Sequence, residues 1–140
     1  MTASHPLIIL RGNSGCGKTS TARLLQRQLG YGTMLVSQDV VRREILRVKD
    51  SESNPAIQLI YDICMYGNNV GYTVILEGIL SNKKYGAMLR RLLNDFQGEK
   101  LIYYFETYRL RKRCAAMLPS QTLMNLANQK CASGGKIKMF

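Results

Sequence analysis

Short, nearly continuous apolar runs alternate along this chain with segments in which apolar residues recur every three or four positions. Runs of the first kind are typical of strands buried on both faces of a parallel sheet, and segments of the second kind are typical of helices that cover such a sheet. Their alternation predicts an α/β fold, a doubly wound parallel sheet of about four strands. The predicted strands are residues 7–10, 33–37, 72–76 and 100–105, and the apolar positions of the predicted helices fall within 22–29, 40–46, 57–65 and 85–93.

The first predicted strand leads directly into a glycine-rich turn. Residues 12–19 read Gly-Asn-Ser-Gly-Cys-Gly-Lys-Thr, which fits the phosphate-loop (Walker A) pattern between a strand and a helix. The glycines let backbone N–H groups point at a phosphate, and the helix N-terminus adds partial positive charge. We expect Lys18 to reach the β- and γ-phosphates of ATP and Thr19 to hold Mg²⁺ through its hydroxyl. The predicted nucleotide-binding residues are Gly12, Asn13, Ser14, Gly15, Cys16, Gly17, Lys18, Thr19 and Ser20.

Asp39 follows the second predicted strand, at the edge of the sheet where ligands of such folds gather. A carboxylate there can orient an acceptor hydroxyl and take its proton, as a kinase requires. Arg42 lies one helical turn further on, shares that face and can grip a polar or anionic acceptor. Lys18, Asp39 and Arg42 are therefore the candidate catalytic residues. The alternative is structural: a helix cap at Asp39 followed by a solvated arginine.

Glu77 follows the third predicted strand and is expected at the same edge. Its carboxylate can hold Mg²⁺ through water, together with Thr19, or bind an acceptor hydroxyl. The alternative is that it accepts hydrogen bonds from a neighbouring loop. Two further helix starts are expected, with Pro55 opening the third helix and Asn82 capping the fourth.

Composition limits the class of protein. A chain of 140 residues suggests one domain, and it contains no apolar run near the ~20 residues that span a bilayer. Residues 1–6 lack the features of a signal peptide, so we expect a cytoplasmic protein with no membrane partner. The four cysteines lie far apart and indicate neither a zinc site nor a disulfide framework. The net charge of +11 is uneven, because residues 106–140 carry 7 Lys and Arg against 1 Asp or Glu.

These motifs together resemble a bacterial family of small P-loop kinases, often labelled uridine-kinase-like or AAA-family ATPases and related to zeta toxins, chloramphenicol phosphotransferase and the phage polynucleotide kinase. The resemblance implies transfer of the γ-phosphoryl group of ATP, with Mg²⁺, to a hydroxyl of a small-molecule acceptor. It also implies that Asp39 activates the acceptor, Arg42 contacts it, and Glu77 and Gly78 line the site. The segments that carry it are 12–19, 37–44 (Ser-Gln-Asp-Val-Val-Arg-Arg-Glu), 54–57 (Asn-Pro-Ala-Ile) and 74–80 (Val-Ile-Leu-Glu-Gly-Ile-Leu).

The resemblance stops after Phe105. Kinases of this family continue with an arginine-bearing lid helix and a fifth strand, and residues 106–140 show neither pattern. A reading-frame slip accounts for this, because synonymous codons for these residues, read two bases on, can spell N-L-S-F-E-E-T-V-R-R-H, which looks like a lid. We therefore interpret residues 1–105 as a P-loop kinase core and residues 106–140 as an aberrant, off-frame basic tail, so that activity of this chain is impaired. The alternative is a divergent basic terminus.

If the tail is off-frame, its positive charge says nothing about a partner, and nucleic acid is not expected. Two other functions stay open. One is a nucleic-acid-binding protein or polynucleotide-end kinase, which the basic balance favours. The other is a non-catalytic nucleotide-binding remnant. The identity of the acceptor, the choice of ATP over GTP and the oligomeric state are not fixed by the sequence.

Overall fold

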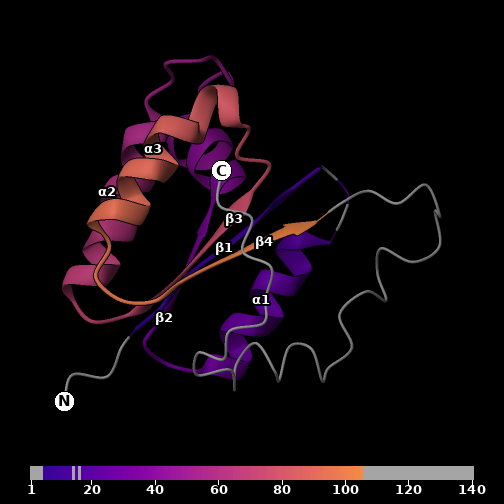
Figure 1. The fold of residues 1–140 in the computed structure, drawn as a ribbon. Coiled ribbons are helices and arrows are strands. Elements are labelled where there is room, and N and C mark those ends of the chain that lie inside the picture. The colour runs from indigo at the N-terminus through magenta and orange to yellow at the C-terminus, as the bar shows by residue number, and fades with distance from the viewer. Residues whose placement is uncertain (1–4, 14, 16, 106–140) are drawn as a thin grey trace.

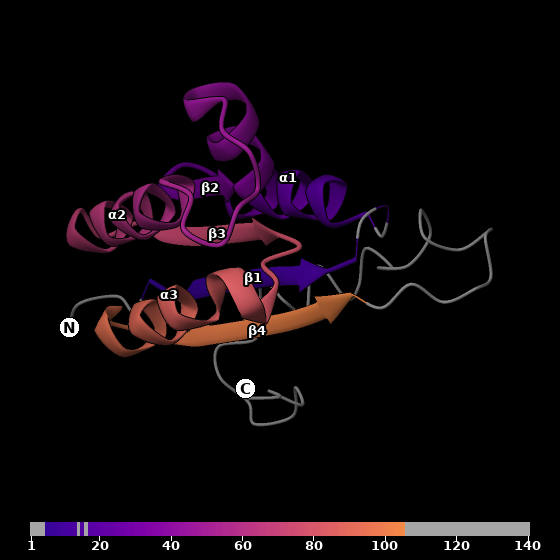
Figure 2. The same cartoon turned by 90° about the horizontal axis from the view of Figure 1, so that it is seen from above.

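The computed structural model describes residues 5–13, 15 and 17–105 (Figure 1). Within them, four strands form one parallel sheet in the order β2-β3-β1-β4, which Figure 2 shows from above. The predicted four-stranded parallel α/β fold is thereby confirmed. The strands are β1 (Leu7–Gly12), β2 (Thr33–Ser37), β3 (Thr73–Gly78) and β4 (Lys100–Phe105).

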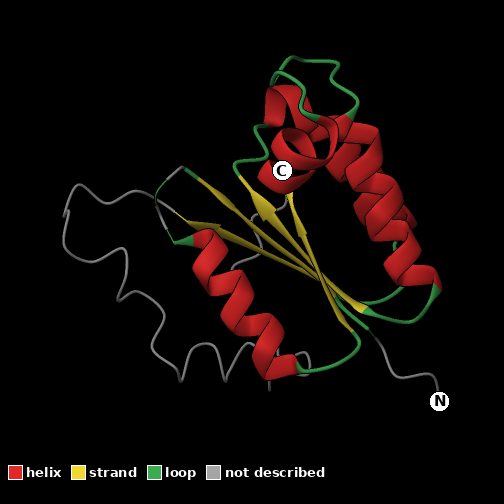
Figure 3. Ribbon diagram, turned by 180° about the vertical axis from the view of Figure 1, so that it is seen from behind, coloured by secondary structure: helices red, strands yellow, loops and turns green. Residues whose placement is uncertain are grey.

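Helices cover both faces of the sheet, as a doubly wound fold requires. The first helix, α1, lies on one face, and the other helices lie together on the opposite face (Figures 1 and 3). Because all neighbouring strands run parallel, their carboxyl ends lie at one edge of the sheet, where ligands of such folds gather. The helices are α1 (Lys18–Leu29), η1 (Val40–Leu46), α2 (Ala56–Asn69) and α3 (Asn82–Asp95).

The apolar runs are explained by two cores, one on each side of the sheet. Along β1, Leu7 and Ile9 belong to the core beneath α2 and α3, whereas Ile8 and Leu10 belong to the core beneath α1. Successive side chains of a strand point to opposite faces, so a strand covered on both faces needs apolar residues at every position. This is why β1 is buried along its whole length.

The segment after β2 differs from the expected α-helix. Residues Val40–Leu46 form a π-helix that ends at Arg47, whose φ of 54° is left-handed. Val41 is buried and Leu46, five residues later, packs against the same core. A five-residue interval matches the wider π turn, and an apolar pattern this short does not separate the two helix types.

Two of the expected helix caps are wrong. Asp39 stands at the start of η1 but makes no side-chain capping hydrogen bond, and Asn82 is already inside α3, with Ser81 at the cap position. At the start of α2 the side chain of Asn54 accepts a hydrogen bond from the backbone N–H of Ala56 at 3.0 Å, beside the predicted Pro55. The side chain of Asn54, which precedes the proline, therefore satisfies a backbone N–H at the start of α2, as a capping residue does.

The predictions for residues 106–140 concern a part of the chain that lies outside the described residues. The missing lid, the missing fifth strand and the domain boundary after Phe105 therefore stay predictions. Within the described residues, no helix is long and apolar enough to cross a membrane.

Candidate functional site

The glycine-rich loop after β1 is folded tightly against β4. Gly12 has a φ of 144°, and a Cβ atom built on it would lie 2.1 Å from the carbonyl oxygen of Phe105, its partner in β4. Gly15 and Gly17 have φ values of 77° and 78°, in the left-handed region that glycine adopts without strain. The loop then enters α1 at Lys18, so that the N-terminus of this helix faces the turn. Ser14 and Cys16 lie outside the described residues.

Lys18 is buried although it is a lysine. Its Nζ donates a hydrogen bond to the backbone carbonyl of Asn13, across the loop that the two residues belong to. A buried ammonium needs partners, and a carbonyl together with a bound phosphate would provide them. The lysine is thus held at the loop, where the prediction places it.

A carboxylate and two hydroxyl groups meet beside this loop. Oε1 of Glu77, at the end of β3, accepts a hydrogen bond from Thr19 Oγ1 at 3.2 Å and another from Ser37 Oγ at 2.6 Å. The Glu77 residue is only 3% exposed. Three elements, α1, β2 and β3, therefore bring together the two residues predicted to hold a metal. Ser37 was missed by sequence reasoning.

The donor set near Glu77 fits Mg²⁺, which prefers oxygen ligands and keeps several water molecules. Among the described residues there is no cluster of three His, Cys, Asp or Glu side chains that could hold a metal. A cation here would instead use Thr19, Glu77 directly or through water, and the phosphate oxygens of the nucleotide. This is the arrangement expected for an ion carried in with its nucleotide.

Asp39 lies beyond the end of β2 with its side chain 63% exposed. Its Oδ1 lies 3.8 Å from Arg42 Nη2 and 3.7 Å from Arg43 Nε, so the predicted proximity of Asp39 and Arg42 is found. The carboxylate is not used as a helix cap, and its exposure leaves it accessible to a ligand. Its assignment as a base stays a prediction.

Arg42 is not a solvated surface residue, because its side chain is only 13% exposed. Nη1 donates to the backbone carbonyl of Val48 at 3.2 Å, which fixes the chain just after η1. Its buried Nε has no hydrogen-bond partner in the described part of the chain. Arg42 thus stabilises the turn after η1 and holds one side of Asp39, while its contact with an acceptor stays a prediction.

Gly78, which is predicted to line the site, is the last residue of β3 and leads into the loop before α3. Its φ is 155°, and a Cβ built on it would lie 2.4 Å from Oε1 of the buried Gln38 side chain. The two chain segments that follow β2 and β3 are therefore in close contact.

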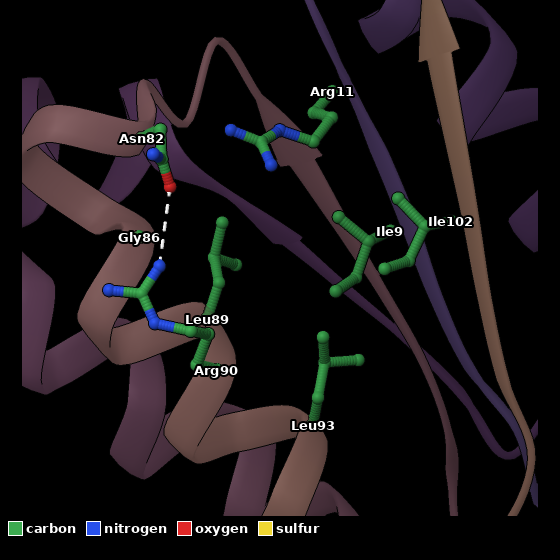
Figure 4. A pocket seen from close by; sticks show the side chains of 8 residues that line it. All are labelled: Ile9, Arg11, Asn82, Gly86, Leu89, Arg90, Leu93 and Ile102. Carbon is green, nitrogen blue, oxygen red and sulfur yellow. Dashed lines mark hydrogen bonds between the residues drawn. The ribbon is translucent and has the colours of Figure 1, made fainter. Parts of the chain in front are cut away.

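A small cavity of about 20 Å³ lies between α3 and the sheet (Figure 4). Its lining includes Arg11, Ile9 and Ile102 but none of the residues predicted for the site. A space of this size holds roughly one water molecule and no nucleotide. This cavity is therefore not the candidate nucleotide site, whose residues lie around the glycine-rich loop.

A family model described as "AAA domain" matches residues 7–118, which is most of the chain and extends past Phe105. A comparison with curated protein sequences finds no match.

Solved structures of kinases share the fold. The APS kinase of Mycobacterium tuberculosis, in complex with AMPPNP and APS, superposes with a TM-score of 0.65 at 18% identity, over 87% of this chain and 73% of that one. A putative kinase from Chloroflexus aurantiacus gives a TM-score of 0.58 at 22% identity, over 73% of this chain and 60% of that one. The Pnkp1/Rnl/Hen1 RNA repair complex gives 0.59 at 18% identity, over 91% of this chain and 44% of that one. At such identities the likeness shows the fold, which is that of P-loop kinases.

Proposed function

This chain belongs to the AAA-domain family and has the P-loop kinase fold, and from that premise we propose that it is an ATP-dependent kinase. The reaction would transfer the γ-phosphoryl group of ATP, with Mg²⁺, to a hydroxyl group of a small-molecule acceptor. That the domain is kinase-like follows from its family and its fold. What we propose beyond this is the nucleotide, the metal ion and the class of acceptor.

The observation that carries it is the convergence of Thr19 and Glu77, 3.2 Å apart, next to the buried Lys18. Phosphoryl transfer depends on positioning and on neutralising negative charge. The loop amides and the α1 N-terminus would bind the phosphates, and Lys18 would turn from the Asn13 carbonyl to the β- and γ-oxygens. Bound Mg²⁺ would offset charge on those oxygens, with Thr19 and Glu77 fixing its place.

The acceptor would lie on the other side of the γ-phosphate, towards Asp39. The exposed carboxylate of Asp39 would accept a hydrogen bond from the acceptor hydroxyl and take its proton as the new O–P bond forms. The bond between the γ-phosphorus and the β–γ bridging oxygen would break in the same transfer, with ADP as the leaving group. Arg42 holds one flank of that carboxylate at 3.8 Å, and the fixed turn after η1 keeps the arginine in place. The guanidinium of Arg42 would attract a polar or anionic group on the acceptor.

A second candidate, a kinase of polynucleotide ends, is favoured by two findings, one structural and one from the sequence. A structural neighbour belongs to an RNA repair complex, although the chain covers 44% of that protein. Such an activity would use the same loop and the same Asp39 and would differ only in the acceptor. The basic balance of the sequence points in the same direction.

The test is a transfer assay with γ-labelled ATP and Mg²⁺ on two panels, small hydroxyl compounds and oligonucleotides with a free 5′-hydroxyl. Label in a small molecule supports the main proposal, and label in oligonucleotides supports the second. Binding of ATP with no label transferred to either panel contradicts both and leaves a nucleotide-binding domain. A matched sample with EDTA in place of Mg²⁺ should transfer no label, because the charge on the phosphate oxygens is then not offset. Transfer without the ion would overturn the metal assignment.

A further inference from the structure

The loop between β3 and α3 contains a strained residue. Leu80 is fully buried, at 0% exposure, and its φ of 48° places it in the left-handed region that leucine rarely adopts. Such a conformation persists only where the surrounding structure enforces it, and it is found most often near functional sites.

Two buried side chains hold Leu80 from both sides of its backbone. The Leu80 N–H donates to Oε1 of Gln38 at 2.8 Å, and the Leu80 carbonyl accepts from Nη2 of Arg11 at 2.5 Å. Gln38 is 4% exposed, and Arg11, a buried arginine, reaches from β1 towards the start of α3 (Figure 4). Both side chains come from the carboxyl ends of strands, since Arg11 is the next-to-last residue of β1 and Gln38 is the first residue after β2.

Gln38 also determines how closely the loop can pass. An added Cβ at Gly78 would lie 2.4 Å from its Oε1 and 2.6 Å from its Cβ, so a side chain at position 78 would displace Gln38. The last residue of β2 and the two that follow it thus have different roles: Ser37 bonds Glu77, Gln38 holds Leu80, and Asp39 is exposed to solvent.

We propose that Gln38 and Arg11 are positioning residues that fix the loop of residues 78–81 as the wall of the acceptor site. This inference rests on the proposed kinase function. If the loop relaxed, the spacing between Asp39 and the end of β3 would change, and with it the fit of the acceptor. The nucleotide would be less affected, because the loop that binds it is fixed separately by the approach of Gly12 to β4 and by α1. Gln38 gives the cleaner test, because Arg11 adjoins Gly12.

The test substitutes Gln38→Met, which keeps the length of the side chain and removes the oxygen that accepts from Leu80. Gln58→Met, at an exposed position on α2, makes the same chemical change away from the site. Three quantities are measured: amide hydrogen exchange in the peptide that contains Leu80, the Kd for the ATP analogue AMPPNP with Mg²⁺, and the KM for the acceptor. In Gln38→Met we expect exchange to rise at least tenfold, acceptor KM to rise at least tenfold, and the nucleotide Kd to stay within twofold. Gln58→Met should change none of them.

Unchanged exchange at Leu80, or an equal loss of nucleotide affinity and acceptor affinity, would overturn the positioning role. If Gln38→Met does not fold, Gln38→Asn keeps the amide but shortens its reach, and the same three results are expected. Absence of transfer by the unaltered chain contradicts the proposed function and with it the acceptor assignment. Exchange at Leu80 still decides in that case whether Gln38 holds the loop, so the two failures are distinguishable.

Discussion

The hydroxyl of Ser37 lies 2.6 Å from Oε1 of Glu77, and this hydrogen bond joins the ends of two neighbouring strands. Ser37 and Glu77 are register partners, because β2 and β3 run parallel side by side. Thr19 reaches the same oxygen from α1 at 3.2 Å. The position of the Glu77 carboxylate beside the phosphate loop therefore depends on a serine outside that loop.

Replacing Ser37 with alanine should loosen the carboxylate. We expect the free energy of unfolding to fall by about 1 kcal/mol, the usual net contribution of one hydrogen bond. The Mg²⁺ concentration needed for half-maximal stimulation of nucleotide binding should rise about tenfold, as happens when a group that orients a metal ligand is lost. A titration with Mg²⁺ in the presence of a fluorescent ATP analogue measures this Mg²⁺ concentration. Ser53→Ala, in the exposed loop before α2, is the control. Identical Mg²⁺ curves for the two variants would contradict the role of Ser37.

Replacing Lys18 with alanine should weaken binding of the triphosphate. The substitution removes the cation that donates to the Asn13 carbonyl and leaves the backbone turn in place. A charge-assisted hydrogen bond contributes about 1.5–3 kcal/mol, so affinity should fall roughly 10- to 100-fold, and turnover should be lost. Calorimetric titration with AMPPNP measures the affinity. Lys83→Ala, which removes an exposed ion pair with Glu52, serves as the control and should bind as the unaltered chain does. Undiminished affinity in Lys18→Ala would refute the phosphate-loop assignment.

Replacing Asp39 with asparagine should separate transfer from binding. The side chain would keep its shape and lose the ability to take a proton, which typically costs ~10²–10⁴ in rate. Because its carboxylate is 63% exposed and its ion pairs with Arg42 and Arg43 are long, at 3.8 and 3.7 Å, stability should change by less than about 1 kcal/mol. Single-turnover transfer and AMPPNP affinity are compared with those of Asp62→Asn on the exposed face of α2. Transfer at the unaltered rate would leave Asp39 as a surface residue without a catalytic role.

The thiol of Cys64 gives a pH dependence that is independent of the site. Burial in the core raises the pKa of this thiol from 9.0 to about 12. Between pH 9 and pH 12 the unfolded chain therefore loses the thiol proton while the folded chain keeps it. The contribution of this group to the free energy of unfolding is complete below pH 9 and is lost as the pH rises towards 12. The slope should be about 1.4 kcal/mol per pH unit. Urea unfolding at pH 8 to 10.5 should show that slope reduced in Cys64→Ala, and an equal slope in both proteins would contradict the prediction.

Sequence patterns predicted the central strands well because β1 and β3 are buried on both faces, so that each contains an unbroken apolar run. The glycine-rich turn between β1 and α1 was predictable because its pattern is local along the chain, while nucleotide binding by Gly12 to Ser20 stays a prediction. Ser37, Gln38 and Arg11 were not predicted, since their roles depend on which strands are neighbours, and a single sequence does not give the order β2-β3-β1-β4. The cap at Asp39 was wrong because Asp39 itself has helical backbone angles, which a capping residue does not, and its carboxylate pairs with arginines instead. The roles assigned to Asp39, Arg42 and Glu77 stay predictions, as does the off-frame origin of residues 106–140.

Two glycines of the loop should respond differently to the same added methyl group. In Gly12→Ala the new Cβ would lie 2.1 Å from the Phe105 carbonyl oxygen and 2.9 Å from the Phe105 nitrogen, both backbone atoms of a paired strand. Neither backbone can move without breaking the pairing of β1 with β4. We therefore expect a loss of about 3 kcal/mol or more in the free energy of unfolding.

In Gly15→Ala the new Cβ would meet nothing within 4 Å, and the cost is confined to the left-handed φ of 77°, about 1–2 kcal/mol. In the proposed function a phosphate would approach the loop through this space, so nucleotide affinity should fall more than stability does. Urea unfolding and AMPPNP titration of both variants measure the two effects. Equal stability of Gly12→Ala and Gly15→Ala would contradict the close approach of the Gly12 and Phe105 backbones between β1 and β4. Full nucleotide affinity in Gly15→Ala would show that the phosphates do not bind against this turn of the loop.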